Sequence, residues 1–309
     1  VAGGKLSMNV SIRFVRKSEN KVFRELVKGL IFIAIFIFSN VFSHEAEKPI
    51  VVIIPSYNNE AWYEKNLGSV FQQQYSNYRV IYIDDCSSDK TAALVQGYLQ
   101  DNDQEGRVTF IKNDIRCGPL FNRYKAVHAC SNEEIVVLLD GDDWFAHNGV
   151  LSFINKIYSE KDVFLTVGNA CKSSTGQKIG YRDYTDEELE KFGVRQLGFR
   201  GVHPRTFYAG LFKKVKAADF MHGGSFLTVA TDVAFMLPMF EMAIDHRRYM
   251  HEILYVYNDE NPINLSKSKL GRQVYFDLVT RNRKSYPKLD TLTQVIDEQR
   301  LPIVLSIVL

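Results

Sequence analysis

The sequence predicts an α/β fold in which a mainly parallel, Rossmann-like sheet is flanked by helices. From residue 49 onward, short apolar runs alternate with amphipathic segments, and the links between them are short. The first run, Ile50–Pro55, is apolar throughout, as is typical of a strand buried on both faces. Such alternation implies right-handed crossovers between parallel strands, whose carboxyl ends then share one edge of the sheet.

The order of elements follows from the same alternation. Strands are expected at 50–55, 78–84, 107–112 and 134–140, and helices at 59–74, from 88 or 89 onward, and at 119–130. The pattern then weakens: the polar stretch 173–201 predicts a loop, before a helix over 231–243 and a strand over 253–257. These elements indicate three parts, which are an N-terminal segment (1–48), an α/β domain (49–265) and a C-terminal helical extension (266–309).

Length and charge narrow the function classes. A chain of 309 residues with 46% apolar residues can bury one large domain. Its formal net charge of +2 and the lack of a one-sided basic block argue against a nucleic-acid partner.

Three carboxylates follow the strand expected at 134–140, in the run Asp140-Gly141-Asp142-Asp143. Like charges this close repel one another, and a bound cation relieves that repulsion. Oxygen ligands at a strand end suit Mg²⁺ or Mn²⁺, which bridge protein carboxylates to a diphosphate. A solvated acidic turn is the alternative interpretation.

A second acidic group, Asp84-Asp85, ends the strand expected at 78–84. One of these carboxylates can accept a hydrogen bond from a nucleobase N–H. The residues that follow, Ser87, Ser88 and Asp89, are equally suited to cap a helix.

Arg116 and Asp232 are two further candidate site residues, for which the sequence signal is weaker. Arg116 lies in a loop, where it can meet a diphosphate or form a surface ion pair. Asp232 opens the helix expected at 231–243, where it is either a cap or a general base.

Together, the segments VVIIPSYNN, IDDCSSDKT, the Arg116 loop and LLDGDDWF resemble the successive blocks of glycosyltransferase family 2, the inverting enzymes of GT-A fold. The resemblance covers residues 50–257 and is stronger in the first half. Thr231 stands before Asp232 where members usually have Glu or Gly. The resemblance implies that Pro55, Ser56, Tyr57 and Asp85 line the nucleoside pocket, and that Arg116 lies near the nucleobase or the phosphates. It also implies that Asp140, Asp142 and Asp143 hold the ribose and the metal, and that Asp232 is the catalytic base.

The expected function is therefore transfer of a sugar, with inversion, from a nucleotide-diphospho-sugar to an acceptor hydroxyl. A UDP-sugar is the expected donor, Mn²⁺ or Mg²⁺ the cofactor, and a glycan, lipid or protein the acceptor. A sugar nucleotidyltransferase and a non-catalytic sugar- or nucleotide-binding protein of the same fold are the alternatives.

The N-terminal part contains an uncharged apolar run at 30–42, preceded by basic and followed by acidic residues. It is shorter than the roughly 20 residues that span a bilayer. The flanking charges favour a signal or anchor-like helix over a buried helix. They predict a membrane-associated protein whose catalytic domain faces the nucleotide-sugar pool, in the cytoplasm or in a secretory lumen.

Overall fold

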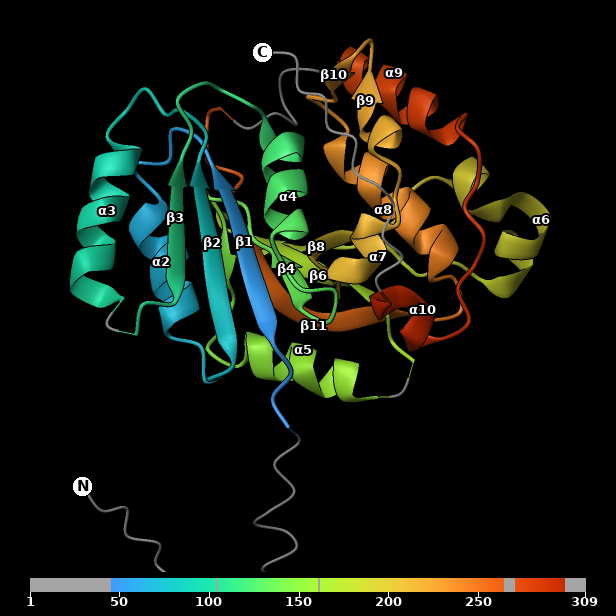
Figure 1. Cartoon of the computed structure of the whole chain (residues 1–309), viewed down its shortest axis with the longest axis horizontal. Coiled ribbons are helices and arrows are strands. Elements are labelled where there is room, and N and C mark those ends of the chain that lie inside the picture. The colour runs from blue at the N-terminus through green and yellow to red at the C-terminus, as the bar shows by residue number, and fades with distance from the viewer. Residues whose placement is uncertain (1–45, 104, 161, 264–269, 298–309) are drawn as a thin grey trace, which may run out of the picture. The chain divides into compact units, whose positions relative to one another are not determined.

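A computed structural model describes residues 46–297, apart from 104, 161 and 264–269 (Figure 1). From Glu47 onward these residues belong to one compact unit. A nine-stranded sheet runs through it in the order β3-β2-β1-β4-β8-β6-β11-β5, with β7 paired to β6. The strands of this sheet are β1 (Ile50–Ser56), β2 (Tyr78–Asp84), β3 (Val108–Lys112), β4 (Ile135–Leu138), β5 (Trp144–Phe145), β6 (Leu165–Lys172), β7 (Lys178–Ile179), β8 (Val202–Tyr208) and β11 (Arg247–Tyr257).

Helices cover this sheet, and a short hairpin of β9 (Met221–His222) and β10 (Ser225–Phe226) stands apart from it. The helices are α2 (Tyr63–Phe71), α3 (Thr91–Asn102), α4 (Pro119–His128), α5 (Val150–Ser159), α6 (Asp186–Leu197), α7 (Ala209–Lys213), α8 (Thr231–Met242), α9 (Leu270–Arg281) and α10 (Leu292–Ile296), with a 3₁₀ turn at Ala217–Phe220.

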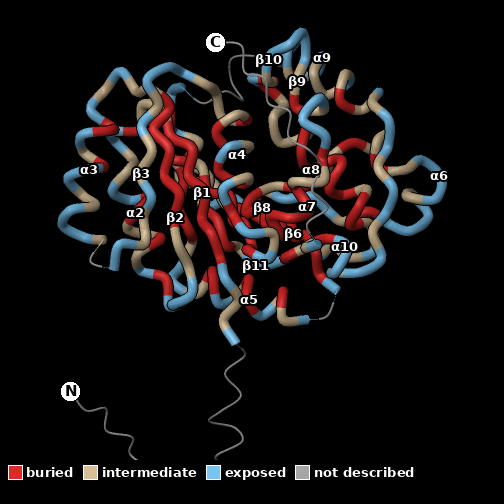
Figure 2. The backbone as a smooth tube through the Cα atoms, in the orientation of Figure 1, coloured by how far each residue is buried: buried red, intermediate tan, exposed pale blue. Residues whose placement is uncertain are grey.

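The first half of the sheet is parallel, as the sequence predicts. β1 pairs in parallel with both β2 and β4, and every residue of β1 is buried (Figure 2). The chain moves outward from β1 to β2 and β3 and then returns to β4 on the other side of β1. With right-handed crossovers, this reversal places α2 and α3 on one face and α4 on the other, and it opens a crevice at the carboxyl ends of β1 and β4.

The second half of the sheet is mixed. β8 runs antiparallel to both β4 and β6, whereas β6 and β11 are parallel. The fold class is therefore confirmed, and the antiparallel insertion of β8 is a feature that the alternation pattern did not predict. β8 brings its side chains next to the end of β4, where the acidic run follows.

The expected loop at 173–201 is wrong in part, because it contains β7 and α6. Thr185 and Glu188 form a reciprocal capping box at the start of α6, which stabilises a helix despite its polar sequence.

The C-terminal helices α9 and α10 pack onto the same unit, α9 against α8 and α10 against α7. The expected domain boundary at 265/266 falls in 264–269, outside the described residues, and the apolar run 30–42 lies outside them too. None of the helices in the described part of the chain is long and apolar enough to cross a membrane.

Candidate active site

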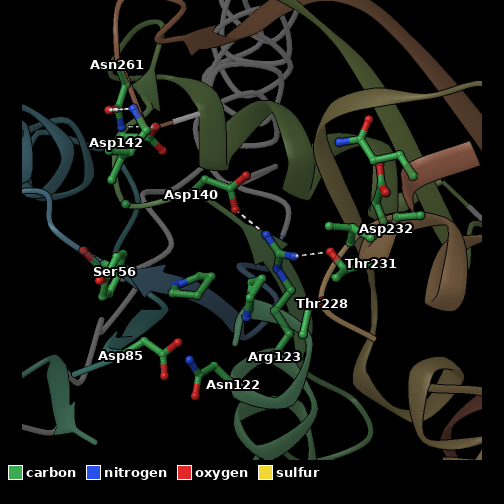
Figure 3. Close-up of a pocket in the computed structure, with 18 of the residues that line it drawn as sticks. Ser56, Asp85, Asn122, Arg123, Asp140, Asp142, Thr228, Thr231, Asp232 and Asn261 are labelled. Carbon is green, nitrogen blue, oxygen red and sulfur yellow. Dashed lines mark hydrogen bonds and ion pairs between the residues drawn. The ribbon is translucent and has the colours of Figure 1, made fainter. Parts of the chain in front are cut away.

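A cleft of about 850 Å³ opens at the carboxyl ends of β1, β2 and β4, between this edge of the sheet and helices α8 and α9. Its size suits a small-molecule ligand. Eight of the nine site residues expected from the sequence line it, and these are Pro55, Ser56, Tyr57, Asp85, Arg116, Asp140, Asp142 and Asp232. Figure 3 shows Ser56 and Asp85 on one side and Asp232 on the other, with Asp140 and Arg123 between them.

At one end of the cleft, Asp85 holds the loop that carries Arg116. Its Oδ1 accepts hydrogen bonds from the Cys117 N–H at 2.8 Å and from the Asn113 amide at 3.0 Å, and its Oδ2 accepts from the Gly118 N–H at 2.8 Å. Burial raises the pKa of Asp85, but these donors and the neighbouring Asn122 amide outweigh burial and hold the pKa below its usual value. Asp85 is therefore an ionised clamp on this loop.

The clamped loop places Arg116 over Tyr57. The guanidinium carbon of Arg116 lies 3.6 Å from the centre of the Tyr57 ring, a cation–π contact. Arg116 is exposed and Tyr57 is half-buried, so both present polar and aromatic surface to the cleft. A planar base and a phosphate both suit such a surface.

The acidic run begins with a turn that packs tightly against β1. Gly141 donates its N–H to the Pro55 carbonyl, and a Cβ added to Gly141 would lie 2.7 Å from the Ser56 hydroxyl and from the Asn59 amide. Only glycine fits this approach. The glycine thus brings the carboxylates on either side of it to the cleft wall.

Asp140 faces a cluster of basic groups. It forms an ion pair with Arg123, whose Nη1 also donates to the Thr231 hydroxyl at 3.3 Å (Figure 3), and its Oδ2 lies 3.6 Å from His203 Nε2. Burial raises the pKa of Asp140, but the positive charges of Arg123 and Arg205 outweigh it and hold the pKa below its usual value. Asp140 is ionised and already partly neutralised by the protein.

Asp142 and Asp143 point in different directions. The Asn261 amide donates to Asp142 Oδ2 at 2.7 Å, and burial together with the charge of Asp140 raises the pKa of Asp142 to about 6. A carboxylate with a raised pKa at a cleft wall is one that a cation would stabilise.

Asp143, in contrast, turns into the protein. The Tyr255 hydroxyl donates to its Oδ2 at 2.6 Å and the Asn258 N–H to its Oδ1 at 2.7 Å, and Asp143 does not line the cleft. Burial and the two neighbouring aspartates raise its pKa well above the usual range. The structure therefore does not bring Asp143 together with Asp140 and Asp142, and within the described residues no three His, Cys, Asp or Glu side chains gather as a metal-binding group.

Asp232 lies in the first turn of α8 at the far end of the cleft. Arg205 Nη2 donates to its Oδ2 at 2.9 Å, and the Asp232 side chain is 33% exposed. Arg205 Nη1 lies 3.0 Å from His203 Nε2. Burial, with the charge of Arg205, lowers the pKa of His203 to about 3, so this imidazole is neutral.

The sequence pattern assigned no role to the basic wall of the cleft, which is formed by Arg123 on α4 and by His203 and Arg205 on β8. The alternation of His203 and Arg205 along a strand was the available signal. Pro204 between them argues against a strand by the usual rule, and this weakened the signal.

Comparisons with known proteins agree with this geometry. A family model described as "Glycosyl transferase family 2" matches residues 51–220, more than half of the chain. The chain belongs to glycosyl transferase family 2. It is a glycosyltransferase, and the match favours this activity over that of a sugar nucleotidyltransferase.

Curated relatives of this glycosyltransferase include enzymes of bacterial glycan synthesis. The GalNAc(5)-diNAcBac-PP-undecaprenol beta-1,3-glucosyltransferase of Campylobacter jejuni is 22% identical over 72% of this chain and 70% of its own length. The UDP-Glc:alpha-D-GlcNAc-diphosphoundecaprenol beta-1,3-glucosyltransferase WfgD of Escherichia coli is 30% identical over 52% of this chain and 67% of its own length. For other relatives, the match covers a smaller share of the relative's own length, for example 33% of WcaA from Escherichia coli.

Solved structures share the GT-A fold. S. aureus TarS 1-349 in complex with UDP-GlcNAc is similar with a TM-score of 0.53 and 16% identity, over 71% of this chain and 61% of that one. GalNAc-T7 with UDP, GalNAc and Mn²⁺ gives a TM-score of 0.52 and 15% identity, over 76% of this chain and 49% of that one.

Proposed function

We propose that this glycosyltransferase transfers a sugar, with inversion, from a UDP-sugar to a hydroxyl group of a lipid-linked glycan. One observation carries the proposal: a single cleft holds a loop suited to a nucleoside at one end, paired carboxylates and arginines in the middle, and the partly exposed carboxylate of Asp232 at the other end. This order matches the order of nucleoside, diphosphate, sugar and acceptor in the reaction.

At the nucleoside end, Gly118 N–H uses one lone pair of Asp85 Oδ2, and the other lone pair can accept a hydrogen bond from an N–H of the nucleobase. Tyr57 and Arg116 offer a surface on which the nucleobase can stack. In the middle, Arg123 brings positive charge to the diphosphate. At the far end, Asp232 takes the proton of the acceptor hydroxyl as this hydroxyl attacks the anomeric carbon and UDP leaves. A single displacement of this kind inverts the anomeric configuration.

A divalent cation fits the middle of the cleft. Asp140 and Asp142 supply hard oxygen ligands, and the raised pKa of Asp142 marks a place where a positive charge is stabilising. We propose that these two residues, without Asp143, would hold Mn²⁺ or Mg²⁺ together with the donor diphosphate. When bound, the ion neutralises charge on the leaving diphosphate.

The acceptor class rests on two supports. Both glucosyltransferases described above carry undecaprenol-linked acceptors in their names. In this chain, Ile263 and Val274 line the cleft and are also 47% and 53% exposed, which gives the cleft an apolar edge. An acceptor with a lipid portion would cover this edge and would bring the enzyme to a membrane surface.

The test is a panel of UDP-, GDP- and dTDP-sugars, with release of nucleoside diphosphate measured with and without Mn²⁺. The acceptors are a diphosphoundecaprenol-linked GlcNAc and the same sugar without the lipid, and NMR of the product gives the anomeric configuration. Asp232→Asn should lower turnover about a hundredfold to ten-thousandfold. Asp245→Asn is the matched control, because Asp245 is an exposed carboxylate paired with Lys288.

Turnover with UDP-sugars, dependent on the metal and on the lipid, is the expected result. A retained anomeric configuration would overturn the single-displacement mechanism. Equal use of the lipid-free acceptor would overturn the acceptor class.

A further inference from the structure

Arg205 joins the two functional ends of the cleft. It lies in the middle of the sheet on β8, opposite Leu138 of β4 and Val167 of β6, and its side chain is only 9% exposed. A residue paired on both sides within a sheet has little freedom to move. The guanidinium is thus presented to the cleft from a rigid support.

The contacts of Arg205 are divided between two groups. Nη2 donates to Asp232 Oδ2 at 2.9 Å, and Nη1 lies 3.0 Å from His203 Nε2. Since His203 is two residues earlier on the same strand, both side chains are on one face of β8. His203 Nε2 in turn lies 3.6 Å from Asp140 Oδ2, so a short chain of polar groups connects the two carboxylates.

The start of α8 needs such support. Its N-cap residue, Ala230, has a left-handed backbone (φ 50°) and gives no side-chain cap. Thr231 and Asp232 are instead held from outside the helix, by Arg123 of α4 and by Arg205 of β8 respectively. Two buried arginines therefore determine where the first turn of α8 lies relative to Asp140.

We infer that Arg205 is a positioning residue, which fixes the Asp232 carboxylate through Oδ2 so that Oδ1 faces the acceptor hydroxyl. Among the described residues, Arg205 is the hydrogen-bond donor to this side chain, and it uses only one of the two oxygens. This inference rests on the proposed role of Asp232 as the base. Without Arg205 the carboxylate would rotate about its side-chain torsions, and an error of about 1 Å in placing a reacting group can reduce turnover about a hundredfold.

A different role is available to the same side chain, which is direct binding of the donor diphosphate. The two roles predict different kinetics. A positioning residue acts through Asp232, so its removal lowers kcat and leaves donor affinity nearly unchanged. A phosphate-binding residue changes donor affinity, whether or not Asp232 is present.

The experiment is a double-mutant cycle of Arg205→Met and Asp232→Asn in the full chain. It measures kcat and KM for the donor, together with UDP affinity by calorimetry. Arg205→Met should lower kcat roughly tenfold to a hundredfold with less than about a threefold change in UDP affinity. The double variant should be no slower than Asp232→Asn alone, because the arginine has nothing left to position.

Arg205→Lys serves as the conservative variant, since it keeps the charge and is expected to recover part of the lost kcat. It also takes the place of Arg205→Met in the cycle if circular dichroism shows that the methionine variant is unfolded. Arg123→Lys is the comparison variant, because that arginine contacts Thr231 and Asp140 and not the Asp232 carboxylate.

Three outcomes overturn the inference. These are multiplicative losses in the double variant, a loss of UDP affinity with kcat retained, and a kcat of Arg205→Met equal to that of the unmodified enzyme. Near-normal turnover by Asp232→Asn would instead overturn the proposed base, and is distinguishable because it appears in the single variant.

Discussion

Replacing Asp85 should both destabilise the protein and weaken its hold on a nucleotide. Asp85 is 4% exposed and accepts two backbone hydrogen bonds and one side-chain hydrogen bond, all from the loop at 113–118. A hydrogen bond to a charged group contributes about 1.5–3 kcal/mol. Because Cys117 and Gly118 are only half-buried, water can replace part of what is lost. We therefore expect Asp85→Ala to lower the free energy of unfolding by about 2–4 kcal/mol.

Asp85→Asn should destabilise the protein less than Asp85→Ala does. The asparagine keeps the shape but has one acceptor oxygen, and its NH₂ group would face a backbone N–H. We expect roughly half the loss seen for alanine, since one of the two oxygens is retained. In both variants the loop carrying Arg116 should loosen from Tyr57, so the affinity for UDP should fall as well.

The assays are urea unfolding followed by circular dichroism, and calorimetry with UDP. Asp114→Ala is the matched control, because it removes a negative charge from the same loop but from an exposed side chain. Stability and UDP affinity of Asp85→Ala equal to those of the control would refute the clamp.

Three further changes test other parts of the structure. Gly141→Ala should cost about 1–3 kcal/mol in urea unfolding, because the new Cβ overlaps Ser56; unchanged stability would show that the turn can relax. Ala230→Gly should raise stability by up to about 1 kcal/mol by relieving the left-handed backbone, and a lower melting temperature would contradict this. Glu134→Gln should cost about 1–2 kcal/mol, because Glu134 makes a two-point ion pair with Arg79.

The Glu134 pair also predicts a pH dependence. Burial raises the pKa of Glu134, but Arg79 and Ser131 outweigh it and lower the pKa below 4.5. Its contribution is then fully present above about pH 4.5 and is lost as the pH falls through the lowered pKa. The difference in stability between Glu134→Gln and the unmodified protein should shrink over that acidic range, and a constant difference would contradict the assignment.

Local patterns predicted much of the first half of the chain. A strand buried on both faces, such as β1, is recognisable as a continuous apolar run. The helix that follows each of β1, β2 and β3 begins within a few residues of that strand. Because the carboxyl ends of parallel strands share one edge, the residues that follow them had to meet there, and Asp85 and Asp140 do. A local signal for α6 was also present in the Thr185–Glu188 capping box, but the polarity of the segment concealed it.

Other features depended on contacts between residues far apart in the sequence. Spacing alone put Asp143 with Asp140 and Asp142, yet Tyr255 and Asn258 hold Asp143 away from the cleft. The direction in which a carboxylate in a tight turn points depends on the hydrogen-bond donors around it. For Asp143 these donors lie on β11 and in the segment after it, more than 110 positions later in the chain.

The sequence by itself thus determined the family, the parallel core and the edge of the sheet where the reacting groups gather. The tertiary structure alone decided that β8 inserts antiparallel beside β4 and brings Arg205 to Asp232. Periodicity reports which face of an element is buried, because burial follows from side chains a few residues apart. It does not report which strands become neighbours, since that depends on the packing of the whole sheet.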